Sequence, residues 1–171
     1  MFIFMRGEEM KGYQQLGFTV NENDSKGNYI PRIQISLVKE IYVSNPSFSC
    51  SQAIAEGEIA EKELRHSDRE KFICLHLNIK NQIISYEVVS MGSLTSSIVH
   101  PREVFKAAIL ANVASVVFLH NHPSGSTEPS LDDIEITNRL CKAGAILGIN
   151  ILDHLIITRN DYFSFKKKGL I

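Results

Sequence analysis

The sequence predicts an α/β protein with a mixed β-sheet flanked by helices. Two runs rich in β-branched residues flank Asn78–Asn81 in the first half and predict a hairpin. Helices and strands alternate in the second half. Among them, "ASVVFL" (114–119) is an unbroken apolar run, as expected of a central strand that is covered on both faces.

The first third of the chain is the least regular part. "NENDSKGNYIP" (21–31) is polar and turn-rich and predicts a loop. "RIQISLVKEIYV" (32–43) has the composition of a strand, and "CSQAIAEGEIAEKELR" (50–65) predicts a helix. We therefore expect an N-terminal extension over residues 1–44 and a folded domain over residues 45–171.

The remaining elements follow the hairpin. "LTSSIV" (94–99) predicts a further strand, and Pro101 is suited to the first turn of a helix. A second helix should begin at Ser130 and end at Gly148, and "INILDHLIIT" (149–158) predicts a strand. The apolar positions at helical spacing are Val104, Ala107, Ala108 and Ala111 in the first helix and Ile136, Leu140, Ala143 and Leu147 in the second.

Composition excludes several classes of protein. Of the 171 residues, 44% are hydrophobic and 22% charged, and the net charge is −1, so no basic footprint of a nucleic-acid binder is present. The three widely spaced cysteines form no disulfide framework and no cysteine zinc knuckle. "MFIFM" is too short for a signal peptide and no apolar stretch is long enough to span a membrane, so we expect a soluble cytoplasmic protein.

The loop "FLHNHPSGSTEPSLDD" (118–133) combines two histidines with two aspartates. His120 and His122 are two residues apart, so in extended backbone both side chains point the same way and could bind one zinc ion. Asp132 and Asp133 lie in the first turn of the next helix, and either could supply a third ligand. Two histidines and one carboxylate would leave a fourth position for water, as in catalytic zinc sites.

Each of these residues also has a structural interpretation. The histidines of a His-x-His pair at a strand end are more often surface or hydrogen-bonding side chains than metal ligands. Ser130-x-x-Asp133 has the form of a capping box. Helical periodicity does not choose between Asp132 and Asp133.

Glu87 is an ionisable residue within an apolar strand. Burial would raise its pKa toward the range that suits a general base, which would carry a proton from water to a leaving amine. A half-exposed position on an antiparallel strand is the structural alternative. His66, His76 and His100 show no ligand spacing.

Glu87, His120-x-His122 and Asp133, with Ser130 three residues before the aspartate, resemble the JAMM (JAB/MPN) metalloprotease motif. Over residues 45–171 the chain resembles the RadC-like JAB domain proteins of bacteria still more closely. The matching blocks are "SIVHPREVFKAAILANVASVVFLHNHPSG", "PSLDDIEITNRL" and "GINILDHLIIT".

This resemblance implies a JAB/MPN architecture of the cytidine-deaminase-like type and a zinc hydrolase site. It implies that His120, His122 and Asp133 are zinc ligands, that Glu87 is the general base, and that Ser130 steadies the oxyanion. It favours Asp133 over Asp132. Longer RadC proteins have a helix-hairpin-helix region before this domain, for which residues 1–44 are too short.

The expected function is zinc-dependent cleavage of a peptide or isopeptide-like amide in a protein or peptide substrate. The alternatives are a DNA-repair accessory, as the family label suggests, and a non-catalytic protein-binding module that retains the metal loop. Zinc nucleobase deaminases are excluded because the chain lacks both H-x-E and P-C-x-x-C. Exposed edge strands would allow a homodimer.

Asp153 and His154 match a pair of residues in the same family. In a strand they point to opposite faces, so only one of them could approach the metal site. That residue could orient a metal-binding histidine, although a structural hydrogen bond is the commoner role.

Overall fold

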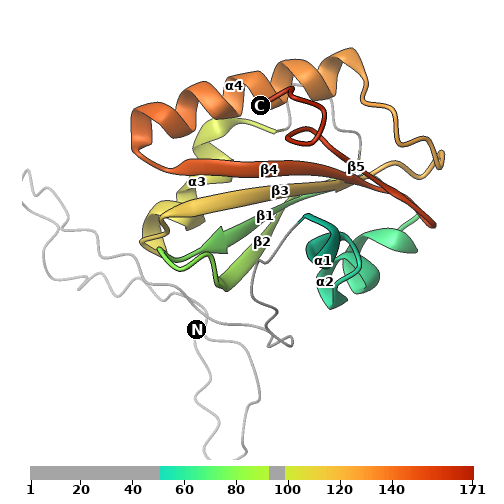
Figure 1. Ribbon diagram of the computed structural model, residues 1–171, viewed down its shortest axis with the longest axis horizontal. Coiled ribbons are helices and arrows are strands. Elements are labelled where there is room, and N and C mark those ends of the chain that lie inside the picture. Colours follow the sequence, from blue (N-terminus) through green and yellow to red (C-terminus); the bar gives the residue numbers. More distant parts are fainter. Residues whose placement is uncertain (1–50, 93–98) are drawn as a thin grey trace, which may run out of the picture. The chain divides into compact units, whose positions relative to one another are not determined.

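The computed structural model describes residues 51–92 and 99–171. In this part of the chain, five strands form one mixed sheet in the order β2-β1-β3-β4-β5, with helices packed against it (Figure 1). The predicted fold class is therefore confirmed. The strands are β1 (Lys71–Leu77), β2 (Ile83–Met91), β3 (Ser115–Asn121), β4 (Asn150–Ile157) and β5 (Tyr162–Ser164).

The predicted hairpin is present as the antiparallel pair β1 and β2. In its turn, the Asn78 side-chain oxygen accepts hydrogen bonds from the backbone N–H groups of Lys80 and Gln82. Asn81 has a φ of 56°, a left-handed conformation that asparagine tolerates better than most residues. The register of the pair shifts by one residue between His76 and Leu77, and beyond this irregularity Glu87 lies opposite Cys74.

The helix predicted over residues 50–65 is divided into three short pieces in the described part. They are α1 (Ser51–Ala55), α2 (Glu58–Ala60) and the π-helical turn η2 (Glu61–Arg65). Gly57 lies between the first two with ψ near 166°, which is extended backbone. The prediction of one continuous helix is therefore wrong, because the chain changes direction at this glycine.

Both long helices begin at the predicted residues, and α4 also ends at the predicted one. α3 (Pro101–Leu110) has Pro101 in its first turn, and α4 (Leu131–Leu147) has Ser130 as its N-cap and Gly148, with a φ of 70°, after its last residue. One expectation is wrong: Leu147 does not belong to the buried stripe of α4 and is 45% exposed. Gly144 of α4 packs tightly against the chain that leads into β4, because a Cβ there would lie 2.7 Å from the Ile149 carbonyl oxygen, and the chain turns back at Gly148.

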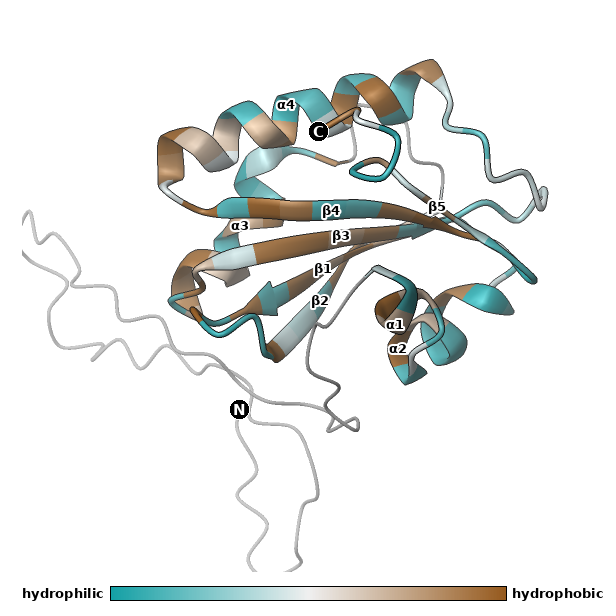
Figure 2. Cartoon of the chain, in the orientation of Figure 1, coloured by the Kyte–Doolittle hydropathy of each residue, from teal (hydrophilic) through white to brown (hydrophobic). Residues whose placement is uncertain are grey.

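Two apolar cores lie on the two faces of the sheet, and Figure 2 shows the hydrophobic strands between them. On one face, α1, α2 and η2 pack over residues such as Leu75, Val117 and Leu155. On the other face, α3 and α4 pack over Phe72, Cys74 and Phe118. β3 is wholly buried, as predicted for a central strand, and its neighbour β1 is almost wholly buried as well.

Some expectations lie wholly or mostly outside the described residues. These are the N-terminal extension over 1–44 with its loop (21–31) and strand (32–43), and the strand over 94–99, of which the structure describes only Val99. β5 was not expected; it pairs antiparallel with the end of β4. In the described ranges, no helix is both long enough and apolar enough to cross a membrane.

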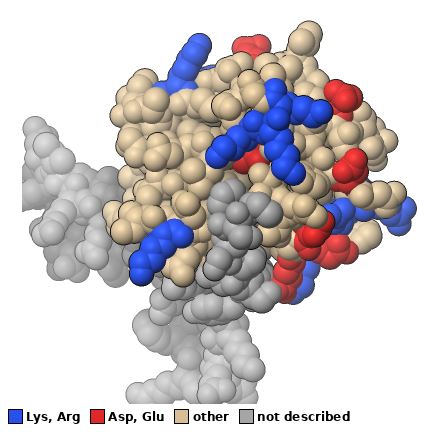
Figure 3. All heavy atoms as spheres, viewed as in Figure 1, with Lys and Arg blue, Asp and Glu red and all other residues tan. Residues whose placement is uncertain are grey.

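On the face drawn in Figure 3, acidic and basic residues form small groups, some of them next to a group of the other sign, with uncharged surface around them. This distribution agrees with the net charge of −1.

His76 on β1 makes folding stability depend on pH. Burial lowers its pKa to about 4, so between the unfolded value of about 6.5 and 4 only the unfolded chain takes up the proton. The contribution of His76 to stability is therefore complete above about pH 6.5 and is lost as the pH falls through this window. When the pH is lowered from about 7 to about 5, we expect the free energy of unfolding of the wild type to fall by about 2 kcal/mol more than that of His76→Leu. Urea denaturation at both pH values checks this, and equal losses in the two proteins would contradict it.

Candidate metal centre

The end of β3 and the start of α4 bring two imidazoles and one carboxylate together. His120 is next to the last residue of β3, and His122 follows the strand directly. Their side chains lie on one side of the backbone, as the spacing predicts. Asp133 is the third residue of α4, and its carboxylate meets both rings.

The spacing of the three side chains suits a metal ion. His120 Nε2 lies 3.1 Å from His122 Nε2 and 3.3 Å from Asp133 Oδ1, and His122 Nε2 lies 3.3 Å from Asp133 Oδ2. A tetrahedral zinc ion with bonds of about 2.0–2.1 Å would hold its ligand atoms about 3.3 Å apart. In the described ranges these are the residues whose potential ligand atoms cluster, all within 4.8 Å of one another. The donor set and its spacing therefore fit a divalent cation such as zinc.

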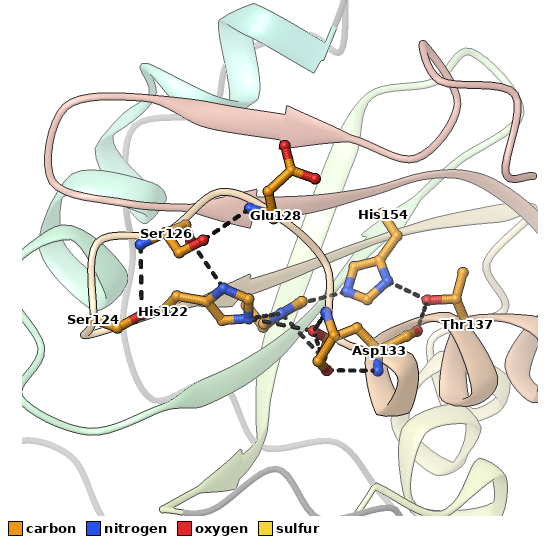
Figure 4. A network of polar contacts seen from close by, with 9 residues as sticks. His122, Ser124, Ser126, Glu128, Asp133, Thr137 and His154 are labelled. Carbon is orange, nitrogen blue, oxygen red and sulfur yellow. Dashed lines mark hydrogen bonds and ion pairs between the residues drawn. The ribbon is translucent and has the colours of Figure 1, made fainter.

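His122 presents its Nε2 to this cluster. Its other ring nitrogen, Nδ1, lies 2.9 Å from the backbone carbonyl oxygen of Ser126, which can only accept a hydrogen bond (Figure 4). Nδ1 therefore carries the proton, and Nε2 of the neutral ring has its lone pair free for a metal. In the metal-free protein the hydrogen bond with Asp133 raises the pKa of His122, against the effect of burial.

Asp133 serves both the helix and the cluster. Its Oδ2 accepts hydrogen bonds from the backbone N–H and the hydroxyl of Ser130, which completes the predicted capping box. Its Oδ1 faces His120. Burial alone would raise the pKa of Asp133, but its contacts with His120, His122 and Ser130 hold it far below its ordinary value. The carboxylate is therefore ionised, as a metal ligand must be.

His120 is fully buried, and burial is the main reason that its pKa is lowered, which keeps the ring in the neutral form that binds metals. Its Nδ1 lies 2.8 Å from Nε2 of His154 on β4, and His154 Nδ1 lies 2.6 Å from the hydroxyl of Thr137. The sequence drew attention to His154, but nothing in it singled out Thr137. Thr137 follows Asp133 by one helical turn, a spacing that could have suggested a hydrogen bond from its hydroxyl to the Asp133 carbonyl oxygen.

Asp153, the neighbour of His154, lies on the other face of the sheet. Its carboxylate accepts hydrogen bonds from the hydroxyls of Ser51 and Ser164, so it ties α1 and β5 to β4. The expectation that only one residue of the pair approaches the metal centre is confirmed.

Glu87 lies on the same face of the sheet as His120. It pairs with Cys74 on β1, which pairs with Phe118 on β3, two residues before His120. Its carboxylate is not part of the cluster formed by the three side chains. Glu87 Oε2 is buried and has no hydrogen-bond partner within 51–92 and 99–171. Burial raises the pKa of Glu87, Lys106 opposes this shift and Glu103 adds to it.

Ser130 is placed as the N-cap of α4. Its hydroxyl accepts a hydrogen bond from the backbone N–H of Asp133 and donates one to the carboxylate of the same residue. The capping role is thus confirmed. The oxyanion role stays a prediction and requires the hydroxyl to turn from Asp133 toward a substrate.

A cavity of about 310 Å³ opens beside His122. Pro123 and Gly125 of the loop line one part of it, and Arg65 and Arg159 line another. A larger hollow of about 470 Å³, lined in part by Lys62, Glu63 and Met91, touches none of the three clustered residues. The smaller cavity touches the cluster through His122.

The other histidines lie apart from the metal centre. His66 is exposed at the end of η2, and His76 forms a hydrogen bond with the Ser85 hydroxyl. The His100 side chain accepts a hydrogen bond at the start of α3.

The pattern of the whole domain identifies its family. The profile of the RadC-like JAB domain matches residues 49–170, more than half of the chain. The chain belongs to the RadC-like JAB domain family. The three clustered side chains and Glu87 all lie inside the matched region.

Several curated relatives of this RadC-like JAB domain carry the name UPF0758 protein. The relative from Desulforamulus reducens is 54% identical over 110 residues, which are 64% of this chain and 48% of the relative. The relative from Methanosarcina mazei is 47% identical over 132 residues, 77% of this chain and 58% of the relative. The relative from Syntrophomonas wolfei is 54% identical over 117 residues, which are 68% of this chain and 50% of the relative. The chain thus spans about half the length of the curated relatives it matches.

Proposed function

We propose that this RadC-like JAB domain is a zinc-dependent hydrolase that cleaves a peptide or isopeptide-like amide bond. The observation that carries the proposal is the convergence of His120 Nε2, His122 Nε2 and the Asp133 carboxylate at 3.1–3.3 Å. Three protein ligands of this kind leave one position open, which distinguishes catalytic from structural zinc sites.

When bound, zinc supplies a water molecule of lowered pKa and a Lewis acid for the substrate carbonyl. The chain's own residues would do the rest. Glu87 would take a proton from the attacking water at Oε2 and deliver it to the nitrogen of the leaving amine. The amide C–N bond breaks, and the products are a carboxylate and an amine. The raised pKa of Glu87, caused chiefly by burial, suits a group that must both accept and release this proton.

The cavity beside His122 is the proposed place for the substrate chain. It is lined by polar and charged groups as well as by Pro123, which suits a polar, extended peptide backbone better than a large apolar ligand. Ser130, at the start of α4, is the proposed hydrogen-bond donor for the substrate oxygen.

The proposal is tested with a library of synthetic peptides and lysine-isopeptide-linked dipeptides in water enriched in heavy oxygen. We expect some members to be cleaved, with one solvent oxygen in each new carboxylate, by the zinc-loaded protein but not after chelation. Reloading with zinc should restore the activity, and iron(II) and manganese(II) serve as comparisons. Cleavage that is equally fast in chelated protein, or intact amides under all conditions, would contradict the proposal.

A further inference from the structure

We infer that His154 and Thr137 are positioning residues that fix the tautomer and the orientation of His120, so that its unprotonated Nε2 faces the cation. This inference rests on the metal centre of the proposed function.

The sheet places His154 beside the metal centre. On the parallel strand β4 it pairs with Phe118, so its ring lies on the same face of the sheet as His120. The ring is fully buried and packs against Phe72, Phe118 and Phe165 at centroid distances of 4.7–5.9 Å. A charged imidazolium would be costly among these aromatic rings, so the neutral ring is favoured.

The direction of these hydrogen bonds can be deduced from the backbone carbonyl of Asp133, at which the series ends, because this group can only accept. The Thr137 hydroxyl donates to the backbone carbonyl oxygen of Asp133 at 2.5 Å, and a carbonyl has no proton to give. Because its proton is used there, the Thr137 oxygen must accept from His154 Nδ1 at 2.6 Å (Figure 4). A neutral imidazole has one donor and one acceptor, so His154 Nε2 accepts.

His120 donates the next hydrogen bond of this series, to His154. Its Nδ1 lies 2.8 Å from the accepting His154 Nε2 and therefore carries the proton. Its Nε2 is then unprotonated and points toward His122 and Asp133. If the same hydrogen bonds were donated in the opposite direction, the neutral His120 ring would carry its proton on Nε2, which would block the atom that binds the metal.

The two ligand histidines are thus oriented in the same manner by different routes. Nδ1 of His122 donates directly to the Ser126 carbonyl oxygen. Nδ1 of His120 is connected to the Asp133 carbonyl oxygen by a series of hydrogen bonds through His154 and Thr137. Asp133 therefore contributes its carboxylate to the cluster and its carbonyl to the orientation of His120. This arrangement couples the first turn of α4 to both β3 and β4.

The first test is the ring tautomer in the metal-free protein, measured by long-range proton–nitrogen NMR of ¹⁵N-labelled histidines. We expect His120 and His154 to carry the proton on Nδ1. Thr137→Val removes the hydroxyl with little change in shape, and we expect a mixture of tautomers for His154 and His120 in this variant. A proton on Nε2 of His120 in the wild type would overturn the inference, whether or not the variant folds.

The second test is zinc affinity, measured by competition with a chromophoric chelator. Loss of a group that bonds a metal ligand directly weakens binding by about 10–100-fold, and we expect Thr137→Val, which acts on His120 through His154, to weaken it by about 10-fold, the lower end of this range. Thr137→Ser keeps the hydroxyl and should restore the affinity. Ser164→Ala is a matched control, because it removes a buried hydroxyl that bonds Asp153 on the opposite face of β4, and its zinc affinity should equal that of the wild type.

The outcomes separate the inference from the proposed function. If the wild type binds zinc and Thr137→Val binds it equally well, the positioning role is wrong while the metal site stands. If the wild type binds no zinc, the proposed function is wrong, and the NMR measurement still decides the direction of the hydrogen bonds.

Discussion

Replacement of Glu87 by glutamine is expected to lower the rate of amide hydrolysis by about 10²- to 10⁴-fold, the usual contribution of a general base. Glutamine keeps the size of the side chain but cannot take up the proton of the attacking water. Glu87 is not one of the three clustered side chains, so the zinc content should remain at about one per chain. Turnover by the zinc-loaded variant and its metal content, measured on the same preparation, check both parts.

Glu135→Gln is the matched control for this experiment. Glu135 is an exposed residue of α4, so the same change of charge occurs outside the proposed site. The control should keep the full rate. If Glu87→Gln hydrolyses the substrate as fast as the control, Glu87 is not the base. A non-catalytic binding module would show no turnover in any of these proteins.

Asp133→Asn is expected to weaken zinc binding by more than about 100-fold, because even residues that only orient a ligand contribute 10–100-fold. The amide oxygen of asparagine can still accept the hydrogen bond from the backbone N–H of Ser130, so the start of α4 should be retained. The loss therefore reports on the carboxylate as a ligand rather than on the fold.

Asp132→Asn provides the comparison for Asp133→Asn. Asp132 lies in the same turn of α4, but it is exposed and does not belong to the cluster. Titration with zinc against a chelator should give the wild-type affinity for this variant. Loss of affinity in Asp132→Asn, with Asp133→Asn unchanged, would show that the wrong aspartate has been assigned.

Much of the metal centre could be predicted from local sequence. The period of two in a strand directs His120 and His122 to one side, and capping chemistry identifies Ser130 as the start of α4. Local periodicity could not choose between Asp132 and Asp133. That choice depends on how the first turn of α4 is rotated relative to β3, and only the resemblance to a family favoured Asp133.

The partners of His120 could not be predicted in the same way. His154 reaches it through the parallel pairing of β3 and β4, whose register includes an irregularity between Val116 and Val117 that no local signal marks. The exposure of Leu147 depends on how α4 meets the sheet rather than on its own sequence. The break at Gly57, in contrast, has a local signal, because glycine weakens the interior of a helix. Dimerisation through edge strands and the N-terminal extension over residues 1–44 stay predictions.

Anomalous diffraction at the zinc absorption edge, from a crystal grown with zinc, tests the metal centre most directly. We expect one strong peak, about 2.0–2.2 Å from His120 Nε2, His122 Nε2 and a carboxylate oxygen of Asp133, with a fourth position facing solvent. A map without density among these three side chains, or with zinc bound only elsewhere, would contradict it.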